Sequence, residues 1–528
     1  MKKYLFLSAA LLLFTASCSN DENNSEQKEP TQAVQFSFIN EDFGEDETPT
    51  RTAETTKPQI IDLGDCEAEI SVESEPATKT RGALTPANGH YTIRAYQAGT
   101  LKGEMSGTFS GGTFTPDGGS NKKLNLPYGT YDFVAFNDDV TVSGTNLTTP
   151  RAKAETARMG FATINITSPT PIKVLFTMKH VGCRLRTQFV CQKHIPENIT
   201  ATLEQTAANV IPTSVAYNPA TKAYTATNGA MAAENNNLPA DNSSKFVGSN
   251  YGQNYAYFST SDYHYFLPTT EGAKLKLVFS AGTVFWKPLT GTIPQLNATL
   301  QMQAGKSYVV KIKLKPGYTY LISDGTTGHF KDTTFGGGTK TPVAVVADPT
   351  ARVAIALKNV SDTEYDWYTT YPHADNTTSY SSELAAYTDM DGYKWTWEAT
   401  GSTDGTIKAN QQTLYPAFYE AGHYNPGVAL SGTLVGKKWY LAGGGEWVTY
   451  IRKNLGFAEA TDILSFYGVM MDEAFTKVGG TKLVRSDKSY LMSTQINAMI
   501  WSVKLMIASG SSGYGTFSTG LVRPFIKY

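Results

Sequence analysis

The sequence predicts a mainly β protein whose last third is an α+β region. Many short runs alternate apolar and polar residues with period two, which places every second side chain on one face of a sheet. The chain has 30 tyrosines and 46 glycines among 528 residues, and these residue types suit strands and the turns between them. After residue 316, aromatic-rich loops and one clear helical pattern replace the regular strands.

Length and charge limit the possible functions. A chain of 528 residues is long enough for about three domains. The net charge of −2 gives no electrostatic basis for binding nucleic acid, whose phosphates require clusters of basic residues. After the first segment, no apolar run approaches the length of about 18 residues that a membrane-spanning helix needs.

Residues 1–18 predict a lipoprotein signal peptide. A short basic start precedes the apolar run 4–14, and small residues lead to Cys18. The pattern resembles a bacterial lipobox, although Thr15 stands where that pattern prefers leucine. Lipidation of Cys18 would attach a precursor to the outer membrane, and the acidic run 19–24 resembles a signal for display on the outer face. The alternative is an ordinary secretory signal that is cut elsewhere.

Residues 19–81 predict a loosely organised tether. Two short alternating runs, 33–38 and 68–73, are each followed by an arginine in a loop rich in proline and threonine. These arginines are Arg51 and Arg81, and exposed loops of this kind are where proteases cut. The other interpretation is a disordered tether with incidental arginines.

The cysteines and histidines predict no disulfide framework, metal site or catalytic site. Besides Cys18 there are Cys66, Cys183 and Cys191, an odd number that argues against a disulfide framework. Cys183 and Cys191 flank a strand-like run and could pair across a short hairpin, or both could remain buried thiols. No histidine lies at zinc spacing from them, and His180 has no nucleophile or carboxylate nearby in sequence. We therefore expect no metal, no other cofactor and no catalytic residue.

Regular strands begin near residue 90 and predict two β domains, 82–187 and 188–315. The first contains the motifs Leu-x-Leu-Pro-x-Gly-x-Tyr-x-Phe at 124–133 and Leu-Phe-x-Met-x-His-x-Gly-x-x-Leu at 175–185. These motifs resemble the fimbrillin family of Bacteroidetes pilus subunits. The resemblance implies that both domains are β-sandwich-like and that the chain is made as a lipoprotein precursor.

The fimbrillin resemblance also implies a route of assembly. Cleavage after an arginine removes the first strand, and a strand from a neighbouring fimbrillin subunit fills the vacated groove. In such β-augmentation, main-chain hydrogen bonds give affinity and alternate side chains fill pockets. The segment 19–81 would then be a tether with a removable N-terminal strand, cut at Arg81 or alternatively at Arg51, and the mature protein would lie in a cell-surface fimbria.

The run 305–315 predicts the most regular strand of the chain. It alternates apolar and cationic residues, so Val310, Ile312 and Leu314 share one face and lysines occupy the other. The dipeptide 316–317, Pro-Gly, ends the strand. This strand separates the β domains from a head, residues 316–528.

The head contains one helical pattern. Trp447, Ile451 and Leu455 lie four residues apart and share a helix face, and Gly456 is a natural stop. Glu446 precedes this face in the first turn, where the helix dipole favours a carboxylate, so we expect a structural role for it.

The order of short motifs in the head resembles the C-type-lectin-like fold, in the variant shared with formylglycine-generating-type domains. The motifs are Asp-Gly-Thr at 324–326, Trp-Tyr-Leu-x-x-x-Gly-Glu-Trp at 439–447, Ser-Thr at 493–494 and Val-Arg-Pro-Phe at 522–525. The chain departs from the pattern at Ala442, where proline is common, and at 491–493, where Trp-Ser-Ser is usual. No cysteine follows Cys191, and the calcium-dependent sugar motifs are missing, so neither activity is carried over. The run 389–392 resembles the opening of a calcium loop but lacks the later ligands.

Aromatic-rich loops predict a recognition surface in the head, because rings supply large and rigid contact area. The candidate ligand-binding residues are Trp367, Tyr393, Trp395, Trp397 and Tyr415. Because the fold is rich in loops, many of its rings must also be core. The sequence does not specify whether the ligand is a glycan or a protein.

These features predict a structural and adhesive pilus subunit rather than an enzyme. A mid-stalk subunit must both accept and donate a strand, but 306–315 is held between two folded regions and 520–528 is expected in the closing sheet of the head. The subunit would accept a strand and donate none, which predicts a tip position. The alternative is a surface glycan-binding lipoprotein, or a glycan-acting enzyme, that never polymerises.

Overall fold

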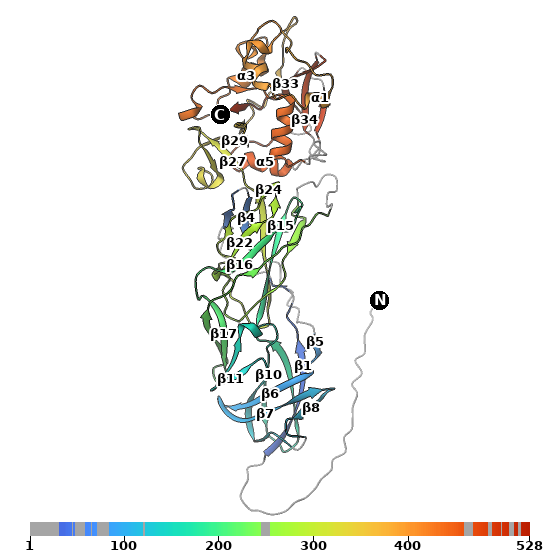
Figure 1. Ribbon diagram of the computed structural model, residues 1–528, viewed down its shortest axis with the longest axis vertical. Coiled ribbons are helices and arrows are strands. Elements are labelled where there is room, and N and C mark those ends of the chain that lie inside the picture. The colour runs from blue at the N-terminus through green and yellow to red at the C-terminus, as the bar shows by residue number, and fades with distance from the viewer. Residues whose placement is uncertain are drawn as a thin grey trace, which may run out of the picture. The chain divides into compact units, whose positions relative to one another are not determined.

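The computed structural model describes residues 31–44, 46–47, 59–64, 66–70, 84–119, 122–243, 254–458, 468–483, 488–497, 499–505, 512–515 and 519–528. The described part is mainly β, as the sequence predicts, and the α-helices gather after residue 316 (Figure 1).

Contacts divide the described residues into two compact units. Unit 1 contains the described residues up to Ile39, with Pro86–Asp138 and Gly160–Met178, and unit 2 contains those of Asn40–Thr85, Asp139–Met159 and Lys179–Tyr528. This division differs from the three consecutive domains 82–187, 188–315 and 316–528 that the sequence predicts. One reason is that the chain returns to unit 2 at two early segments. The other is that Phe457 and Met470 of the head belong to the same hydrophobic cluster as the preceding sheets.

Unit 1 is built on a sheet with the strand order β5–β1–β14–β13–β10–β6–β7–β8, with β9 paired to the start of β1. The strands are β1 (Thr31–Glu41), β5 (Leu84–Pro86), β6 (Gly89–Gln97), β7 (Thr100–Ser110), β8 (Thr113–Pro116), β9 (Asn125–Pro127), β10 (Gly129–Asn137), β13 (Arg158–Ile166) and β14 (Ile172–His180). The alternation of β1 turns Phe36 and Phe38 into the core, where they pack on Tyr91, Phe133 and Phe176. Aromatic pairs of this kind contribute about 0.5–1.5 kcal/mol each beyond the area that they bury.

Unit 2 begins with the sheet body, which we define as its residues up to Pro316. The main sheet has the order β20–β15–β26–β4–β3, with β2 also paired to β26 and β21 to β15. Its strands are β2 (Asp46–Glu47), β3 (Gln59–Asp62), β4 (Cys66–Ile70), β15 (Cys183–Cys191), β20 (Tyr257–Thr260), β21 (His264–Phe266) and β26 (Ser307–Pro316).

Further sheets of the sheet body have the orders β11–β12–β17–β18, β19–β16–β22–β25 and β23–β24. Their strands are β11 (Thr141–Ser143), β12 (Asn146–Pro150), β16 (Thr200–Gln205), β17 (Ile211–Asn218), β18 (Ala223–Gly229), β19 (Glu234–Asn235), β22 (Leu275–Ala281), β23 (Thr283–Val284), β24 (Lys287–Pro288) and β25 (Thr292–Ile293). The 3-10 turns are η1 (Arg151–Lys153) and η3 (Gly272–Lys274).

The head is built on a sheet of order β28–β27–β29–β30–β37–β32, with the smaller sheets β31–β36 and β33–β34–β35. Its strands are β27 (Thr319–Ile322), β28 (Thr327–His329), β29 (Pro342–Asp348), β30 (Val353–Ala356), β31 (Tyr365–Asp366), β32 (Trp439–Tyr440), β33 (Ser489–Ile496), β34 (Met499–Leu505), β35 (Ser512–Gly515), β36 (Thr519–Gly520) and β37 (Phe525–Lys527). Its helices are α1 (Glu383–Ala386), α2 (Gly392–Trp397), α3 (Pro416–Gly422), α4 (Gly444–Glu446), the π-helix η8 (Trp447–Leu455) and α5 (Gly468–Thr476), with 3-10 turns η4 (Phe330–Asp332), η5 (Ala399–Gly401), η6 (Lys408–Asn410) and η7 (Gly432–Leu434).

The helical pattern predicted around Trp447 is confirmed. Helices α4 and η8 run without a break to the stop at Gly456, and Trp447, Ile451 and Leu455 are all buried in the head core. The hydrogen bonds of η8 have the wider π spacing rather than the α spacing, which four-residue periodicity does not reveal.

Within the segment 520–528, which the sequence predicts in the closing sheet of the head, Phe525–Lys527 forms β37 between β30 and β32. Cys183 and Cys191 do not pair across a hairpin, because both lie on the single strand β15 at its two ends. Cys66, Cys183 and Cys191 are buried thiols that form no disulfide, and burial raises the pKa of the thiols of Cys183 and Cys191.

None of the helices in the described residues has the length and apolar character that a bilayer crossing requires.

Candidate functional site

The strand β26 is the centre of the first candidate site, an interface between strands. It pairs in parallel with β15, where Gln188 faces Lys311, and antiparallel with β4, where Ala68 faces Leu314. Its buried and less buried positions alternate from residue 310 onward, as the sequence predicts. The inner face places Ile312 and Leu314 in the hydrophobic core, and burial of such a side chain contributes about 1.5–3 kcal/mol.

The outer face of the same strands carries charges. Glu69 of β4 and Lys315 of β26 form an ion pair of 2.6 Å between Oε2 and Nζ. Burial lowers the pKa of Lys315, but the hydrogen bond to Glu69 and the charges of Glu473 and Glu67 outweigh this effect, so the pKa is raised. Since the charged form of Lys315 is favoured by these carboxylates, β4 and β26 are held together by charge as well as by main-chain bonds.

A second ion pair joins β4 to the head. Glu67 Oε2 accepts a hydrogen bond from Lys477 Nζ, and the two side chains are only 9% and 12% exposed. Lys477 follows α5 and lies 4.5 Å from the centroid of the Phe330 ring. A buried pair of this kind costs much more to break than an exposed one, because the remaining charge has no partner.

The hairpin of β3 and β4 makes one more contact with the head. Ile60 faces Glu69 in the hairpin, and Asp62 at the end of β3 lies 2.7 Å from Nζ of Lys331. Burial acts to raise the pKa of Asp62, but the hydrogen bonds from Lys331 and from the backbone of Gly64 outweigh this effect, so the pKa of Asp62 is below its usual range. The hairpin therefore both covers one edge of β26 and binds residues of the head.

The predicted processing residues Cys18, Arg51 and Arg81 lie outside the described residues. The strands on their N-terminal side can nevertheless be placed: β1 and β2 precede residue 51, and β3 and β4 lie between residues 51 and 81.

The predicted recognition aromatics fall into two groups. Trp367, Trp395 and Tyr415 have 0%, 1% and 0% of their surface exposed. A buried ring cannot meet a ligand at the surface, so the prediction for these three is corrected to core packing. Tyr393 and Trp397 are only partly buried against the head core, and they remain candidates.

Trp397 is held firmly by its neighbours. Its indole Nε1–H donates to the carbonyl of Trp439 at 2.6 Å, and Nζ of Lys438 lies 4.0 Å from its ring centroid. Tyr393 packs edge-on against Tyr440 at 5.7 Å between centroids.

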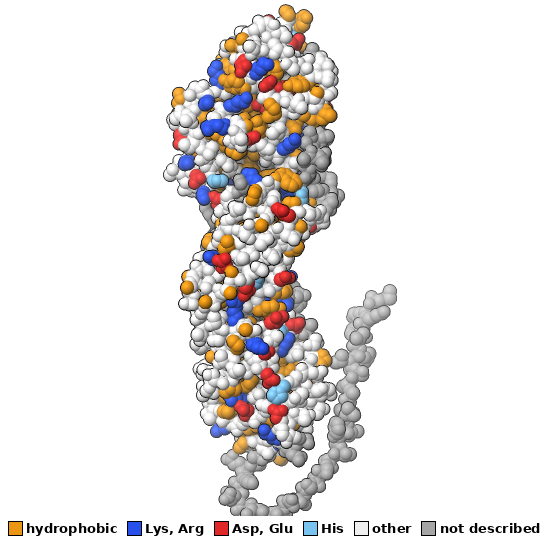
Figure 2. Space-filling view, viewed as in Figure 1, with side chains coloured by type: hydrophobic (Ala, Val, Ile, Leu, Met, Phe, Trp, Pro, Cys, Tyr) orange, Lys and Arg blue, Asp and Glu red, His pale blue; other side chains and the backbone are white. Residues whose placement is uncertain are grey.

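Sequence reasoning missed Tyr371, which is 85% exposed. It follows the Tyr365–Tyr368 aromatic run by three residues and is preceded by two threonines, a polar setting that could have indicated exposure. Its neighbour His373 stacks on Tyr368 at 3.7 Å between centroids, which anchors the loop that carries Tyr371. On the face of the head that Figure 2 shows, hydrophobic side chains lie among acidic and basic ones.

Glu446 has the structural role that the sequence predicts. Its Oε2 accepts the backbone N–H of Gly443 at 2.8 Å, and its Oε1 accepts the hydroxyl of Tyr440 at 2.7 Å. Burial raises the pKa of Glu446 to about 8, although both hydrogen bonds act to lower it. The carboxyl caps the start of α4 and is closed off from solvent.

Asp389 of the suspected calcium loop is also buried. Its carboxylate accepts the indole N–H of Trp395 at 3.0 Å to each oxygen, the hydroxyl of Thr494 and the backbone N–H of Asp391. Burial raises its pKa against these hydrogen bonds. The oxygens are thus committed to the fold, and the described residues contain no cluster of three or more His, Cys, Asp or Glu that could hold a metal.

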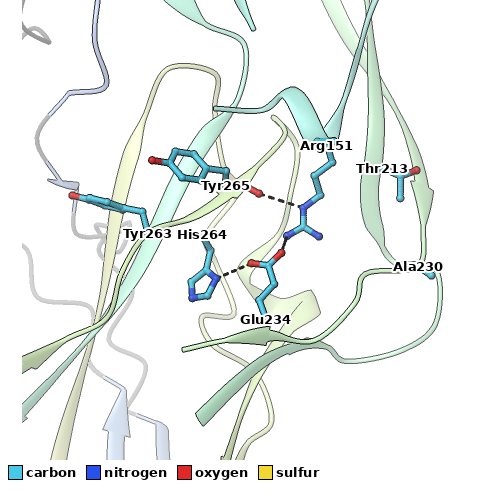
Figure 3. A pocket seen from close by; sticks show the side chains of 8 residues that line it. Arg151, Thr213, Ala230, Glu234, Tyr263, His264 and Tyr265 are labelled. Atoms are coloured by element: carbon cyan, nitrogen blue, oxygen red, sulfur yellow. Dashed lines mark hydrogen bonds and ion pairs between the residues drawn. The ribbon is translucent and has the colours of Figure 1, made fainter. Parts of the chain in front are cut away.

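A cleft of about 420 Å³ lies in the sheet body. Figure 3 shows Arg151 and His264 converging on the carboxylate of Glu234, at 2.6 Å and 2.7 Å. Burial raises the pKa of Glu234, but the hydrogen bond from His264 and the charge of Arg151 lower it below its usual range. Arg151 also donates to the carbonyl of Tyr265 at 3.2 Å. The residues lie far apart in sequence, so no local motif could have indicated them, and their charges are already satisfied by one another.

Comparison with known proteins gives a consistent set of names but only weak similarity. No protein-family model matches the chain, and no curated protein matches it. A candidate cell adhesion protein of Bacteroides ovatus aligns with 10% identity and a TM-score of 0.32, over 54% of this chain and 92% of its own. A fimbrial protein of Bacteroides ovatus aligns with 12% identity and a TM-score of 0.24, over 95% of this chain and 100% of its own. A fimbrial protein of Bacteroides vulgatus aligns with 12% identity and a TM-score of 0.27, over 46% of this chain and 92% of its own. Similarity at these TM-scores carries no argument about the present chain.

Proposed function

We propose that this chain is a structural and adhesive subunit of a cell-surface fimbria, attached as a precursor to the outer membrane through lipidated Cys18. Cleavage after Arg81 removes an N-terminal segment, and a strand of another subunit takes its place. The head then binds a glycan or protein ligand and, in the C-type-lectin-like interpretation, does so without calcium.

The observation that carries the proposal is the position of the strands before residue 81. β1 places Phe36 and Phe38 in the core of unit 1, and β4 places Ala68 and Ile70 in the core of the sheet body. Loss of either strand would open a sheet and expose apolar surface. An extended segment from elsewhere could restore both the main-chain bonds and the core contacts.

The two possible cleavage sites have different consequences. Cleavage at Arg51 would release β1 and β2 but keep the β3–β4 hairpin, whereas cleavage at Arg81 would release all four strands. Either cleavage would remove β2 from the start of β26, at Ser307 and Tyr308, but only cleavage at Arg81 would also remove β4 from its second half, Ile312–Pro316.

The proposed position of this subunit at the tip of the fibre rests on two strands that cannot be donated to a neighbouring subunit. β26 lies between β15 and β4, and β37 lies between β30 and β32 of the head sheet. Withdrawal of either would divide a sheet and uncover a core. A subunit that accepts a strand and donates neither of these would begin a fibre with its head outermost.

Sequencing the N-terminus of surface material tests the maturation step. We expect the mature chain to begin at Gly82, and a start at Thr52 would assign cleavage to Arg51. Chains in assembled fibres that still begin at Cys18 or Ser19 would contradict strand removal and favour a surface glycan-binding lipoprotein that does not polymerise.

Gold labelling tests the position in the fibre. An antibody against residues 318–528 should mark one distal end of each fibre. Label at regular intervals along the shaft would contradict the tip position, while leaving the cleavage step intact.

A further inference from the structure

The strand β4 has an unusual combination of side chains for its length. On the inner face, Cys66, Ala68 and Ile70 are buried in the hydrophobic cluster, with Ala68 fully inaccessible. On the outer face, Glu67 and Glu69 are two residues apart. From Cys66 to Ile70 the side chains are small, acidic, small, acidic and aliphatic. The inner and outer positions are restricted for different physical reasons.

The inner positions limit the size of a strand that could lie beside β26. Cys66 and Ala68 face Pro316 and Leu314 in the antiparallel register, and the cluster leaves neither side chain more than 2% exposed. A larger side chain at either position would overpack the core at a typical cost of about 1–3 kcal/mol. Ile70 faces Ile312, where an aliphatic side chain completes the contact.

The outer positions require negative charge. Lys315 is paired with Glu69, and Lys477 with Glu67, and both lysine side chains are largely covered, at 25% and 12% exposure. A neutral strand in this position would leave two partly desolvated ammonium groups without their ion-pair partners, with only the charge of Glu473 still acting on Lys315. A carboxylate adds the attraction between two opposite charges to the hydrogen bond that an amide oxygen could also accept, so the lysines distinguish an acidic strand from an isosteric amide.

We infer that the place now held by β4 is a binding site for an extended segment with acidic side chains two residues apart, which Lys315 and Lys477 recognise. This rests on the proposed function, in which β4 leaves after cleavage at Arg81. The two lysines belong to different parts of unit 2, since Lys315 lies on β26 and Lys477 follows α5 of the head. Occupation of the site by an acidic strand therefore also holds α5 against the sheet body.

The first experiment uses the full chain with a specific protease site in place of residues 78–81. After cleavage, the fragment is displaced by fluorescent peptides that span residues 59–72, and binding is followed by anisotropy. The peptides carry the native sequence, E67Q with E69Q, or E67K with E69K. We expect the glutamine peptide to bind about tenfold more weakly than the native peptide or worse, and the lysine peptide more weakly still.

A charge reversal makes the recognition specific. On a chain with Lys315→Glu and Lys477→Glu, the lysine peptide should recover binding and the native peptide should lose it. Equal binding of the native and glutamine peptides to the unmodified chain would overturn the inference, and so would failure of the reversed chain to prefer the lysine peptide.

A second measurement separates this inference from the proposed function. If the cleaved fragment stays bound and no peptide enters, strand removal fails, and release of the fragment by urea is then measured instead. The fragment with E67Q and E69Q should leave at clearly lower urea than the native fragment. A matched control is Glu204→Gln, which removes a partly exposed cross-strand carboxylate opposite Lys276 and should not change release. Release at the same urea concentration for all three would overturn the inference.

Discussion

The sheet body and the head are stabilised in different ways. In the sheet body, long strands bury alternate apolar residues, and charges such as Glu204 and Lys276 pair across strands at partly exposed positions, although Glu67 and Lys193 are buried. The head has shorter helices and strands and places whole charged groups inside. Its buried ionisable residues include Asp389, Lys408, Glu446, Arg452 and Arg523.

Several of these buried groups are held by a specific set of polar atoms. Lys408 Nζ, for example, donates to Asn376 Oδ1 at 3.1 Å and to Ser402 Oγ at 2.6 Å, and burial lowers its pKa to about 8. Apolar packing tolerates exchange of similar side chains, whereas an unsatisfied buried polar group costs its full desolvation. Single-atom changes should therefore be more costly in the head than in the sheet body.

Tryptophan fluorescence can follow the head separately. Six of the seven tryptophans lie after residue 316, and Trp286 is the exception. Far-UV circular dichroism, by contrast, reports mainly on the strands.

The largest effect is expected for Trp395→Ala. The change removes a fully buried ring and leaves the carboxylate of Asp389 without its indole donor, so we expect the free energy of unfolding of the head to fall by about 4 kcal/mol. Urea unfolding followed by tryptophan fluorescence measures it. Trp395→Phe keeps most of the volume and removes the donor, and it should cost about 1–3 kcal/mol. A cost below 0.5 kcal/mol for Trp395→Phe would break the comparison, because the buried hydrogen bond would then contribute little.

The next effect is expected at the contact between the two regions. Lys477→Met leaves Glu67 buried without a partner, so unfolding free energy should fall by about 3–5 kcal/mol. Lys276→Met, its counterpart at a partly exposed pair, should cost at most about 1 kcal/mol. Similar costs for both variants would mean that the pair of Glu67 and Lys477 is as solvated as a surface pair.

The same contrast explains what could be predicted from sequence. Alternation predicted β26 and its buried face, because strand register follows directly from a period of two. Four-residue spacing likewise predicted the buried face of η8. The burial of Trp367, Trp395 and Tyr415 was missed, since in a loop-rich fold no periodicity tells an inward ring from an outward one.

Long-range pairs escaped prediction for a related reason. Glu67 and Lys477 are 410 residues apart, and Arg151, Glu234 and His264 come from three separate segments. A local pattern carries no information about such partners. The proposed acidic-strand site could therefore be found only after the fold had placed Lys315 and Lys477 beside the same strand.

A smaller effect is expected from pH, through Glu446 of the head. The pKa of Glu446 is about 8 in the folded protein, above the ordinary value of about 4.5, so the folded state holds a proton that the unfolded state has lost. This contribution to stability is complete below about pH 4.5 and is lost as pH rises through about 8. Between about pH 6 and pH 7, Glu446 should lower the unfolding free energy of the head by about 1.4 kcal/mol.

Glu446→Gln provides the control for this pH dependence. Glutamine keeps the size of the side chain but does not titrate, so the fluorescence-detected unfolding curve should lose most of this slope between about pH 6 and pH 7. An unchanged slope in the variant would assign the dependence to other buried groups of the head.

The smallest effect on stability is expected for Tyr371→Ala, which should separate recognition from packing in the head. The ring is 85% exposed, so its removal creates no cavity and should change the unfolding free energy by less than about 0.5 kcal/mol. Exposed rigid rings supply contact area at low entropic cost, so the same change should weaken ligand capture severalfold if this loop is part of the recognition surface. Binding of the purified chain to arrays of immobilised glycans and glycoproteins gives the measurement.

Tyr128→Ala in unit 1, where the ring is 39% exposed, serves as the control and should leave capture unchanged. Equal capture by all three proteins would exclude Tyr371 and leave Tyr393 and Trp397 as the candidates to test next. Loss of stability without loss of capture would instead show that this loop belongs with the polar framework of the head.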